Sequence, residues 1–265
     1  MKKPHHSAFI ITSSNHGTMI VNRHDHHTVN EKRFGVGHQI LSTGSFDPSE
    51  VNVVRELLVK RREVYGDGVI ALDCGANIGV HTVEWARTMS GWGNVTAFEA
   101  QKWIYYALAG NLAINNCFNA TAVHAAIGRR DGSIEVPMLD YTTASSFGSL
   151  ELNASNHNES IGQSVSYEKA NTSKTNMVSI DSLNLKRLDF IKLDIEGMEL
   201  DALAGARKTI AKFKPMMLIE HIKVDLAKLT YWLESNGYKH TFFGVNMLCA
   251  HQTDKMKITK RGRQI

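Results

Sequence analysis

The chain has 265 residues, of which 43% are hydrophobic and 21% are charged. This length and composition are ordinary for a globular protein with one large α/β core. No apolar run is long enough to span a bilayer, and the run Ala8–Ile11 is too short for the hydrophobic region of a signal peptide. We therefore expect a cytoplasmic protein without a membrane span.

The spacing of the cysteines and the placement of the charges narrow the class of protein further. The three cysteines, Cys74, Cys117 and Cys249, fit neither a disulfide framework nor a zinc site, so we expect reduced thiols. The net charge of +4 arises in a basic tail at 255–265, which holds five basic side chains and no acid. The rest of the chain is near neutral, and the tail has no aromatic residues for base stacking. We interpret the tail as a solvated terminus and do not expect nucleic acid as a partner.

The first 46 residues form an N-terminal extension that differs from the rest. Two short β-rich runs, Ala8–Thr12 and Thr18–Asn22, predict a β-hairpin, which could serve as a small lid or as a contact in a homodimer. Three nearby histidines, His24, His26 and His27, lack the spacing of a helical zinc pair. We assign no metal to them.

A helix is predicted to begin just after this extension. Asp47 is placed to act as the N-cap, Pro48 stands at the first helical position, and Glu50 matches the acid of a capping box. Apolar residues then follow at helical spacing through Leu58.

From residue 69 onward, short β-rich runs alternate with helical segments. This alternation predicts a doubly wound, mostly parallel sheet in one domain at 47–254. The runs His240–Phe243 and Leu248–Ala250 are close enough for a C-terminal antiparallel hairpin. The expected strands are 69–73, 94–99, 120–125, 189–194 and 216–220, and the expected helices are about 79–90, 101–115, 198–212 and 224–236.

Residues 128–176 interrupt this rhythm, with a short strand indicated at Ser133–Val136 and a long loop at 138–176. The segment is rich in Asn, Ser and Glu, with little apolar content after Leu152. Long loops inside compact domains are commonly functional. We interpret this one as a mobile loop over the active site.

The segment Val69–Thr82, which reads VIALDCGANIGVHT, combines an apolar strand, a glycine turn and the start of a helix. Gly75 and Gly79 permit close approach of the backbone to a ligand, and a helix N-terminus favours an anionic group. Dinucleotide folds use the spacing G-x-G-x-x-G instead. Asp73 before the turn would repel a pyrophosphate but accept bonds from an ammonium group. A packing turn of an ordinary α/β fold is the simpler alternative.

More acids stand at the ends of the other predicted strands. Glu99 ends the second strand, where a carboxylate can accept bonds from both hydroxyls of a ribose. Asp194 ends the fourth strand, with Glu196 in the turn after it, and Glu220-His221 ends the fifth. Because the carboxyl ends of parallel strands meet at one edge, these side chains should surround one crevice.

The sequence resembles the FkbM-type methyltransferases, a class I, Rossmann-like family that uses S-adenosylmethionine. The resemblance covers about residues 69–250. One departure is Ala100, where the family often has proline after the ribose-binding acid. The stretches that carry the resemblance are Leu72–Thr82, Ala97–Glu99, Ala125–Gly128, Ser179–Leu183, Ile191–Glu199 (IKLDIEGME), Leu203–Ala206 and Glu220.

The resemblance implies transfer of a methyl group from S-adenosylmethionine to a hydroxyl, and less often to a nitrogen, of a sugar, polyketide or other small metabolite. Asp194 would lie nearest the methyl group, with Glu196, Glu220 or His221 as base or acceptor-orienting group. Residues expected to bind the donor are Asp73, Gly75, Ala76, Asn77, Gly79, His81, Thr82, Glu99, Ala126 and Asp194.

Four alternatives remain open. A divalent metal held by Asp194, Glu220 and His221 would suit the chemistry of these ligands, although it is not favoured. The others are a nicotinamide oxidoreductase, which the missing G-x-G-x-x-G disfavours, an RNA methyltransferase, and a binding module that keeps the fold without catalysis.

Overall fold

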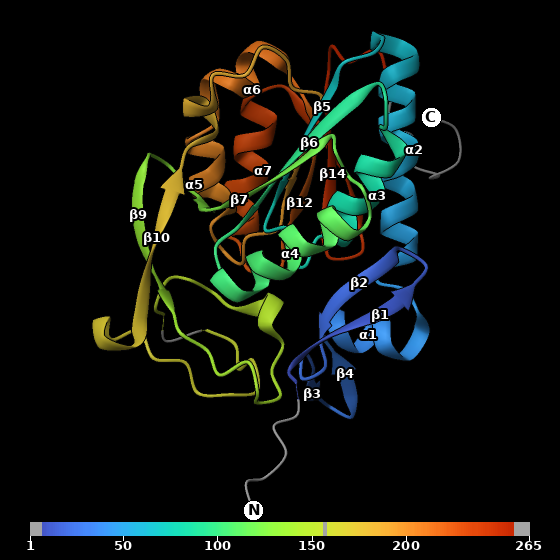
Figure 1. Cartoon of the computed structure of the whole chain (residues 1–265). Helices are drawn as coiled ribbons and strands as arrows, with labels where there is room; N and C mark the ends of the chain where they lie inside the picture. The colour runs from blue at the N-terminus through green and yellow to red at the C-terminus, as the bar shows by residue number, and fades with distance from the viewer. Residues whose placement is uncertain (1–6, 156–157, 257–265) are drawn as a thin grey trace, which may run out of the picture.

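A computed structural model of the chain describes residues 7–155 and 158–256 (Figure 1). Its centre is a seven-stranded sheet in which only β14 runs antiparallel to its neighbours. The doubly wound, mostly parallel sheet and its C-terminal antiparallel hairpin are thereby confirmed. In spatial order the strands are β13 (Tyr238–Phe243), β14 (Asn246–His251), β12 (Met216–Glu220), β11 (Phe190–Leu193), β5 (Val69–Cys74), β6 (Gly93–Glu99) and β7 (Ala120–His124).

Helices cover both faces of this sheet (Figure 1). One face is covered by α2 (Pro48–Tyr65), α3 (Val80–Thr88) and α4 (Lys102–Ile114), and the other by α5 (Glu199–Ala204), α6 (Arg207–Phe213) and α7 (Leu226–Ser235). Alternate side chains of each strand enter opposite cores. Ala71 belongs to the first hydrophobic cluster and Leu72 to the second.

The N-terminal residues contain the predicted hairpin and three further elements. The hairpin is β1 (Phe9–Ser14) with β2 (Gly17–Asn22), and it is followed by β3 (His27–Val29), β4 (Lys32–Phe34) and α1 (Val36–Thr43). Asn111 of α4 ties β2 to the domain, because its side chain bonds both the N–H and the carbonyl oxygen of Ile20.

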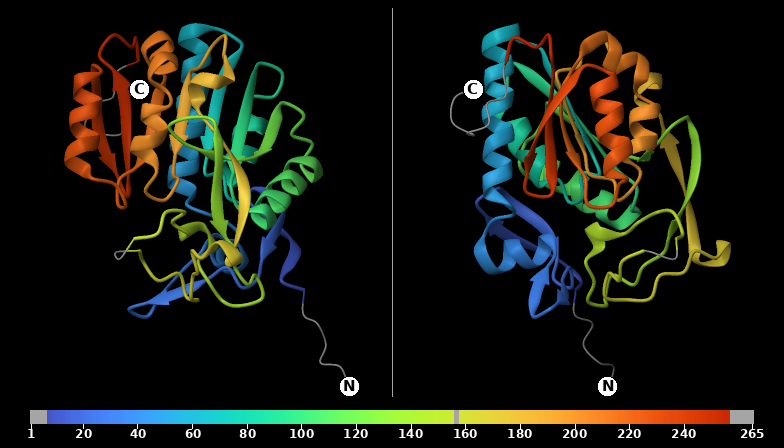
Figure 2. Two further views of the ribbon diagram at one scale, coloured as in Figure 1. Left: turned by 90° about the vertical axis from the view of Figure 1, so that its left-hand side faces the viewer. Right: turned by 180° about the vertical axis from the view of Figure 1, so that it is seen from behind.

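The segment after β7 is more ordered than we expected. β8 (Ala126–Ile127), β10 (Thr172–Val178) and β9 (Gly132–Pro137) form a small three-stranded sheet. The expected loop at 138–176 is therefore wrong at its end, where residues 172–176 pair with β9. Short 3-10 turns, η1 (Phe147–Ser149), η2 (Lys169–Asn171) and η3 (Ile180–Leu183), punctuate this region. Figure 2 shows the N-terminal segment in blue and this loop in yellow-green on the same side of the sheet.

Two local expectations are wrong. The helix expected at 198–212 is two helices, because Asp181 accepts bonds from the N–H groups of Lys208 and Thr209 and so caps α6 as a separate helix. Asp47 precedes α2 as expected, but its side chain makes no capping bond and its backbone has a φ of 35°. The capping box therefore does not form.

Candidate active site

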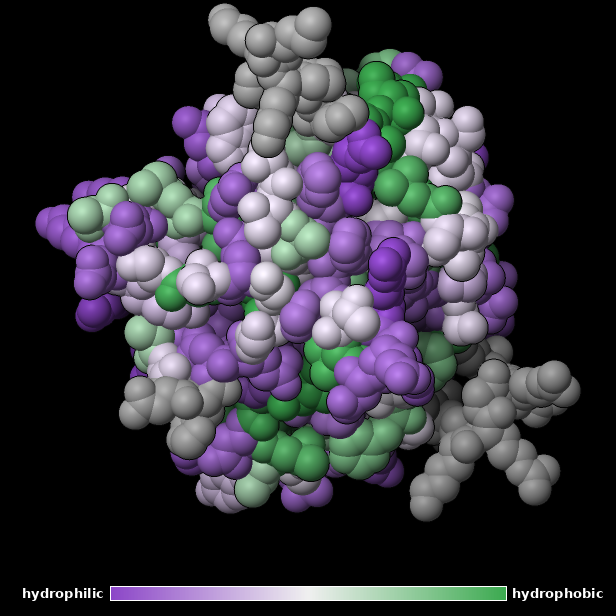
Figure 3. Space-filling model, turned by 90° about the horizontal axis from the view of Figure 1, so that it is seen from below, coloured by the Kyte–Doolittle hydropathy of each residue, from purple (hydrophilic) through white to green (hydrophobic). Residues whose placement is uncertain are grey.

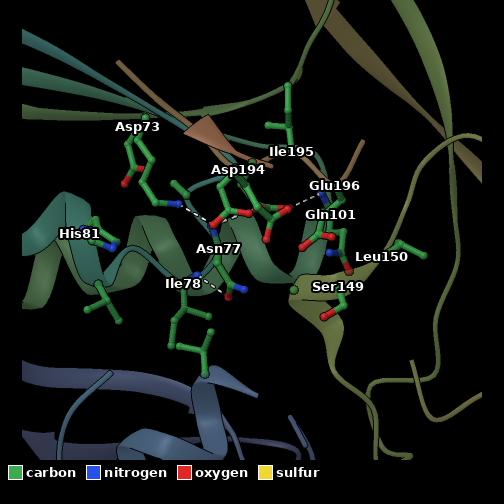
Figure 4. A pocket seen from close by; sticks show the side chains of 18 of the residues that line it. Asp73, Asn77, Ile78, His81, Gln101, Ser149, Leu150, Asp194, Ile195 and Glu196 are labelled. Atoms are coloured by element: carbon green, nitrogen blue, oxygen red, sulfur yellow. Dashed lines mark hydrogen bonds and ion pairs between the residues drawn. The ribbon is translucent and has the colours of Figure 1, made fainter. Parts of the chain in front are cut away.

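A cavity of about 290 Å³ opens at the carboxyl ends of β5, β6, β11 and β12. Its size lies near the lower end of the range for small-molecule sites. The N-terminal residues contribute Phe34 and Phe46 to its wall, and the loop contributes Ser149 and Leu150. Figure 4 shows Asp73, Asp194 and Glu196 gathered around one space, with Ser149 and Leu150 across from them. Every strand tip predicted from the sequence contributes to this cavity.

The glycine turn forms one wall as its sequence predicts. Gly75 has a φ of +78°, and a Cβ there would overlap the carbonyl oxygen of Asp194, so a side chain would push β5 and β11 apart. Gly79, with a φ of +87°, precedes the first residue of α3. Gly75, Ala76 and Asn77 line the cavity, whereas Gly79 and Thr82 do not.

Asp73 is buried at the end of β5 and held from one side. The hydroxyl of Thr82 donates to its Oδ2 at 2.6 Å. Its Oδ1 has no hydrogen-bond partner among the described residues, although this atom is buried and Asp73 lines the cavity. The free oxygen is therefore available to a donor group of a ligand.

Glu99 ends β6 and is only 7% exposed. Its two oxygens accept the N–H groups of Asn77, at 3.0 Å, and of Gln101, at 2.8 Å. Burial raises the pKa of Glu99 to about 7 despite these bonds. Gln101 then donates to the carbonyl oxygen of Phe147, which links this acid to the loop. Ala126 of β8 lines the same cavity.

Asp194, Glu196 and Glu220 form an acidic cluster in which one carboxylate oxygen of each lies within 4.8 Å of the others. Lys192 donates to Asp194 at 2.6 Å, and Lys223 lies 2.5 Å from Glu196. Although burial opposes its charge, the carboxylates of Asp194 and Asp73 raise the pKa of Lys192, so this side chain is a cation.

The cluster is crowded with like charges. Burial and the neighbouring Asp194 raise the pKa of Glu196 to about 8. Burial, with repulsion from Asp194 and Glu196, raises the pKa of Glu220 to about 9. Carboxyl groups that line a cavity and have a pKa raised this far are a common feature of active sites.

Of the two histidines predicted for the site, one lines the cavity and the other does not. His81 lines the cavity and lies 3.2 Å from Glu50 of α2, whereas His221 is absent from the lining and packs its ring against Phe242. Glu50, expected to cap a helix, also lines the cavity and accepts a bond from Asn246 at 2.7 Å. Nothing in the local sequence signals that Glu50 or Asn246 belongs to the site.

The strand order, the glycine turn and the acids at the strand tips together define a Rossmann-like methyltransferase fold. The sequence model of a family described as "Methyltransferase FkbM domain" matches residues 73–240. The chain belongs to this family of S-adenosylmethionine-dependent methyltransferases.

The individual proteins that resemble this chain share only low sequence identity with it. "Methyltransferase 1" of Beauveria bassiana (strain ARSEF 2860) is 25% identical over 186 residues, which are 66% of this chain and 74% of that protein. The crystal structure of an FkbM methyltransferase from Methylobacillus flagellatus is 22% identical with a TM-score of 0.48. That match covers 70% of this chain and 43% of the other. A precorrin-6y C5,15-methyltransferase from Geobacter metallireducens is 13% identical with a TM-score of 0.43, and the match covers 78% and 89% of the two chains.

Over the part of the chain that the structure describes, no helix has the length and hydropathy needed to cross a membrane. All three cysteines are buried free thiols. Of the basic tail, Lys255 and Met256 are described, and the other four basic residues lie outside the described residues.

Proposed function

We propose that this methyltransferase transfers the methyl group of S-adenosylmethionine to a hydroxyl of a sugar or another small metabolite. The observation that carries the proposal is the placement of two buried acids, Asp73 and Glu99, on one side of the cavity, with the acidic cluster on another. One side can hold a donor, and the other can receive an acceptor.

The donor would lie across the tips of β5 and β6. Asp73 Oδ1 would accept a bond from its ammonium group, and Glu99 would accept bonds from its ribose hydroxyls. Thr82 would act indirectly by holding Asp73. Ala126 would contact the adenine from the side, and the turn at Gly75–Asn77 would follow the donor closely. Asp194, against that turn, would then lie nearest the methyl group.

The sulfonium methyl group is already activated, so the protein has to align the acceptor and remove its proton. Glu196 suits this step, because a pKa of about 8 makes it a stronger base than an ordinary carboxylate. Glu220 can orient the hydroxyl from the next strand. His221 has no role in this reaction, because its ring packs against Phe242 and it is not one of the residues that line the cavity.

The surroundings of the cavity favour a small acceptor over RNA. Ile222, Phe242 and Val245 are exposed hydrophobic residues beside the tip of β12, and Val245 also lines the cavity. Figure 3 views the molecule from below relative to Figure 1 and shows hydrophobic side chains gathered near the lower edge of that view. A phosphate backbone would instead need basic side chains here.

Calorimetry with S-adenosylmethionine tests the donor site. Glu99→Ala should weaken binding by about tenfold or more, since a charged hydrogen bond contributes roughly 1.5–3 kcal/mol. Glu63→Ala is the control, because Glu63 is exposed on α2 and pairs with Lys60. Wild-type affinity in Glu99→Ala would overturn the assignment of the ribose site.

Transfer of a labelled methyl group into cell-extract fractions tests the reaction. Label in small molecules supports the proposal, whereas label that disappears on ribonuclease treatment would favour RNA. Donor binding with no transfer into any fraction would favour a non-catalytic module.

A further inference from the structure

We propose that Asp194, Glu196 and Glu220, together with the amide oxygen of Asn246, bind one divalent cation such as Mg²⁺ or Mn²⁺. The site would differ from the metal set considered from the sequence, since Glu196 and Asn246 take the place of His221. Its role in methyl transfer rests on the proposed function, but the binding of the cation does not.

The spacing of the three carboxylates matches one ion. One oxygen of each lies within 4.8 Å of the other two. Oxygen ligands lie about 2.0–2.6 Å from Mg²⁺ or Ca²⁺, so two ligands on opposite sides of an ion are separated by roughly 4–5 Å. All three oxygens can therefore contact the same cation.

Asn246 is an observation independent of the acidic cluster. It is only 3% exposed, lines the cavity and stands opposite Glu220 in the pairing of β12 with β14. Its Nδ2 donates to Glu50, which fixes the amide, while its buried Oδ1 has no hydrogen-bond partner among the described residues. Directly paired residues place their side chains on the same face of a sheet. Asn246 thus brings an unpaired neutral oxygen to the side of Glu220.

Within the described part of the chain, the nearby lysines form their ion pairs with Asp194 and Glu196 rather than with Glu220. The side chain of Glu220 is buried, with the residue only 8% exposed, and within the described residues its Oε2 accepts no hydrogen bond. Lys192 and Lys223 contact Asp194 and Glu196, which leaves the second oxygen of each carboxylate for another partner. An ionised carboxylate without a partner is costly at this buried position, and a bound cation would offset that cost.

The donor set selects the kind of ion. Carboxylate and amide oxygens are the ligands of Mg²⁺, Mn²⁺ and Ca²⁺, whereas zinc sites usually include histidine or cysteine. An ammonium group of a ligand is the main rival occupant. It would neutralise one charge and offer three N–H donors to four acceptors, so a divalent ion suits the cluster better. In the proposed reaction the cation would bind an acceptor hydroxyl and lower its pKa.

Titration of the full chain with Mn²⁺ after treatment with a chelator tests the site, with free Mn²⁺ measured by electron paramagnetic resonance. One bound Mn²⁺ per chain is expected. Glu220→Gln should bind Mn²⁺ at least about tenfold more weakly, because even the loss of a group that only supports a metal ligand weakens metal affinity about 10- to 100-fold. Asn246→Leu should also weaken binding, whereas Asn246→Asp, which keeps an oxygen ligand, should retain it. Glu63→Gln should bind as the wild type does.

Folding and donor binding are measured on the same preparations. Glu220→Gln should fold about as well as the wild type, because burial raises the pKa of Glu220 to about 9 and glutamine then replaces a neutral carboxyl of nearly the same shape. Absence of Mn²⁺ binding by the wild type at millimolar concentration, or wild-type Mn²⁺ affinity in Glu220→Gln, would overturn the site. If S-adenosylmethionine still binds in those cases, the proposed function stands while the metal site fails.

Discussion

The protonation state of Glu99 should determine how the affinity for the donor depends on pH. Its pKa is raised to about 7 by burial, so below that pH the free protein holds a neutral carboxyl. A carboxylate that accepts two hydroxyl bonds must be ionised. Affinity should therefore be full above about pH 8 and fall by roughly tenfold per pH unit well below pH 7. Calorimetry across this range measures the slope.

The variant Glu99→Gln separates this effect from other titrations. Glutamine keeps an acceptor oxygen but cannot ionise, so its donor affinity should be weaker and should lose the part of the slope that belongs to Glu99. Glu196, Glu199 and Glu220 also titrate, because burial raises the pKa of each, and they remain in the variant. An identical slope in both proteins would contradict the prediction.

At the scale of residues, the sequence reveals those parts of the site that belong to local motifs. Asp73 and Glu99 stand at the ends of apolar strands, and Asp194 stands in the motif K-x-D-x-E-G, so their place at the sheet edge could be predicted. Glu50 and Asn246 could not, because their roles arise from packing between elements about 200 residues apart in the chain, where Asn246 bonds Glu50. Such contacts leave no periodicity or spacing in the sequence.

At the scale of elements, the strands and helices from residue 69 onward could be predicted within a few residues, because hydrophobic alternation sets them. The errors occur where a distant side chain decides. Asp181 caps α6 from another segment, so one predicted helix becomes two. β10 forms because β9 offers it hydrogen bonds, although its own sequence is polar. Local propensity cannot report either partner.

Asp25 joins two elements that wall the cavity, and its substitution should loosen them. The residue is buried, its Oδ2 accepts the N–H of Gly37 in α1, and its Oδ1 accepts the N–H of Phe147 in η1. An asparagine at this position would not serve both N–H groups, since an amide has one oxygen. Asp25→Asn should therefore speed amide exchange around Phe147 and weaken donor binding several-fold. Hydrogen exchange read by mass spectrometry checks the first effect.

Asp25 also predicts a pH dependence of stability. Burial raises its pKa from 3.8 to about 6, so between these values the folded state binds more protons than the unfolded state. The contribution of Asp25 to the free energy of unfolding should then decrease as the pH rises from about 4 to 6, and stay constant above. Asp25→Asn should remove this slope, while Asp67→Asn, at an exposed acid, should keep it. Unfolding in urea at several pH values would decide between these outcomes.

At the scale of the whole molecule, the N-terminal residues belong to the core of the domain. Met19 and Val21 of β2 and Ile40 of α1 lie in the same hydrophobic cluster as Leu58 and Leu108. Phe34 and Phe46 line the cavity from the same segment. Composition alone predicts that residues 1–46 are separate from the domain, whereas residues 7–46 pack against it in the structure. The segment thus completes both the core and the cavity wall.

Substitution of Met19 tests how much the packing of the N-terminal segment contributes to the free energy of unfolding. Its side chain is fully buried, whereas Ile11 on the adjacent strand of the same hairpin is 68% exposed. Met19→Ala should lower the free energy of unfolding by about 2–5 kcal/mol, and Ile11→Ala by less than about 0.5 kcal/mol.

A chain that begins at residue 47 should lose cooperative unfolding and donor binding, because it exposes the apolar surface that β2 and α1 cover. Urea unfolding followed by circular dichroism measures all three proteins. An unchanged midpoint in the shortened chain would show instead that the domain folds without the segment, and equal losses in the two alanine variants would show that the hairpin does not dock through Met19.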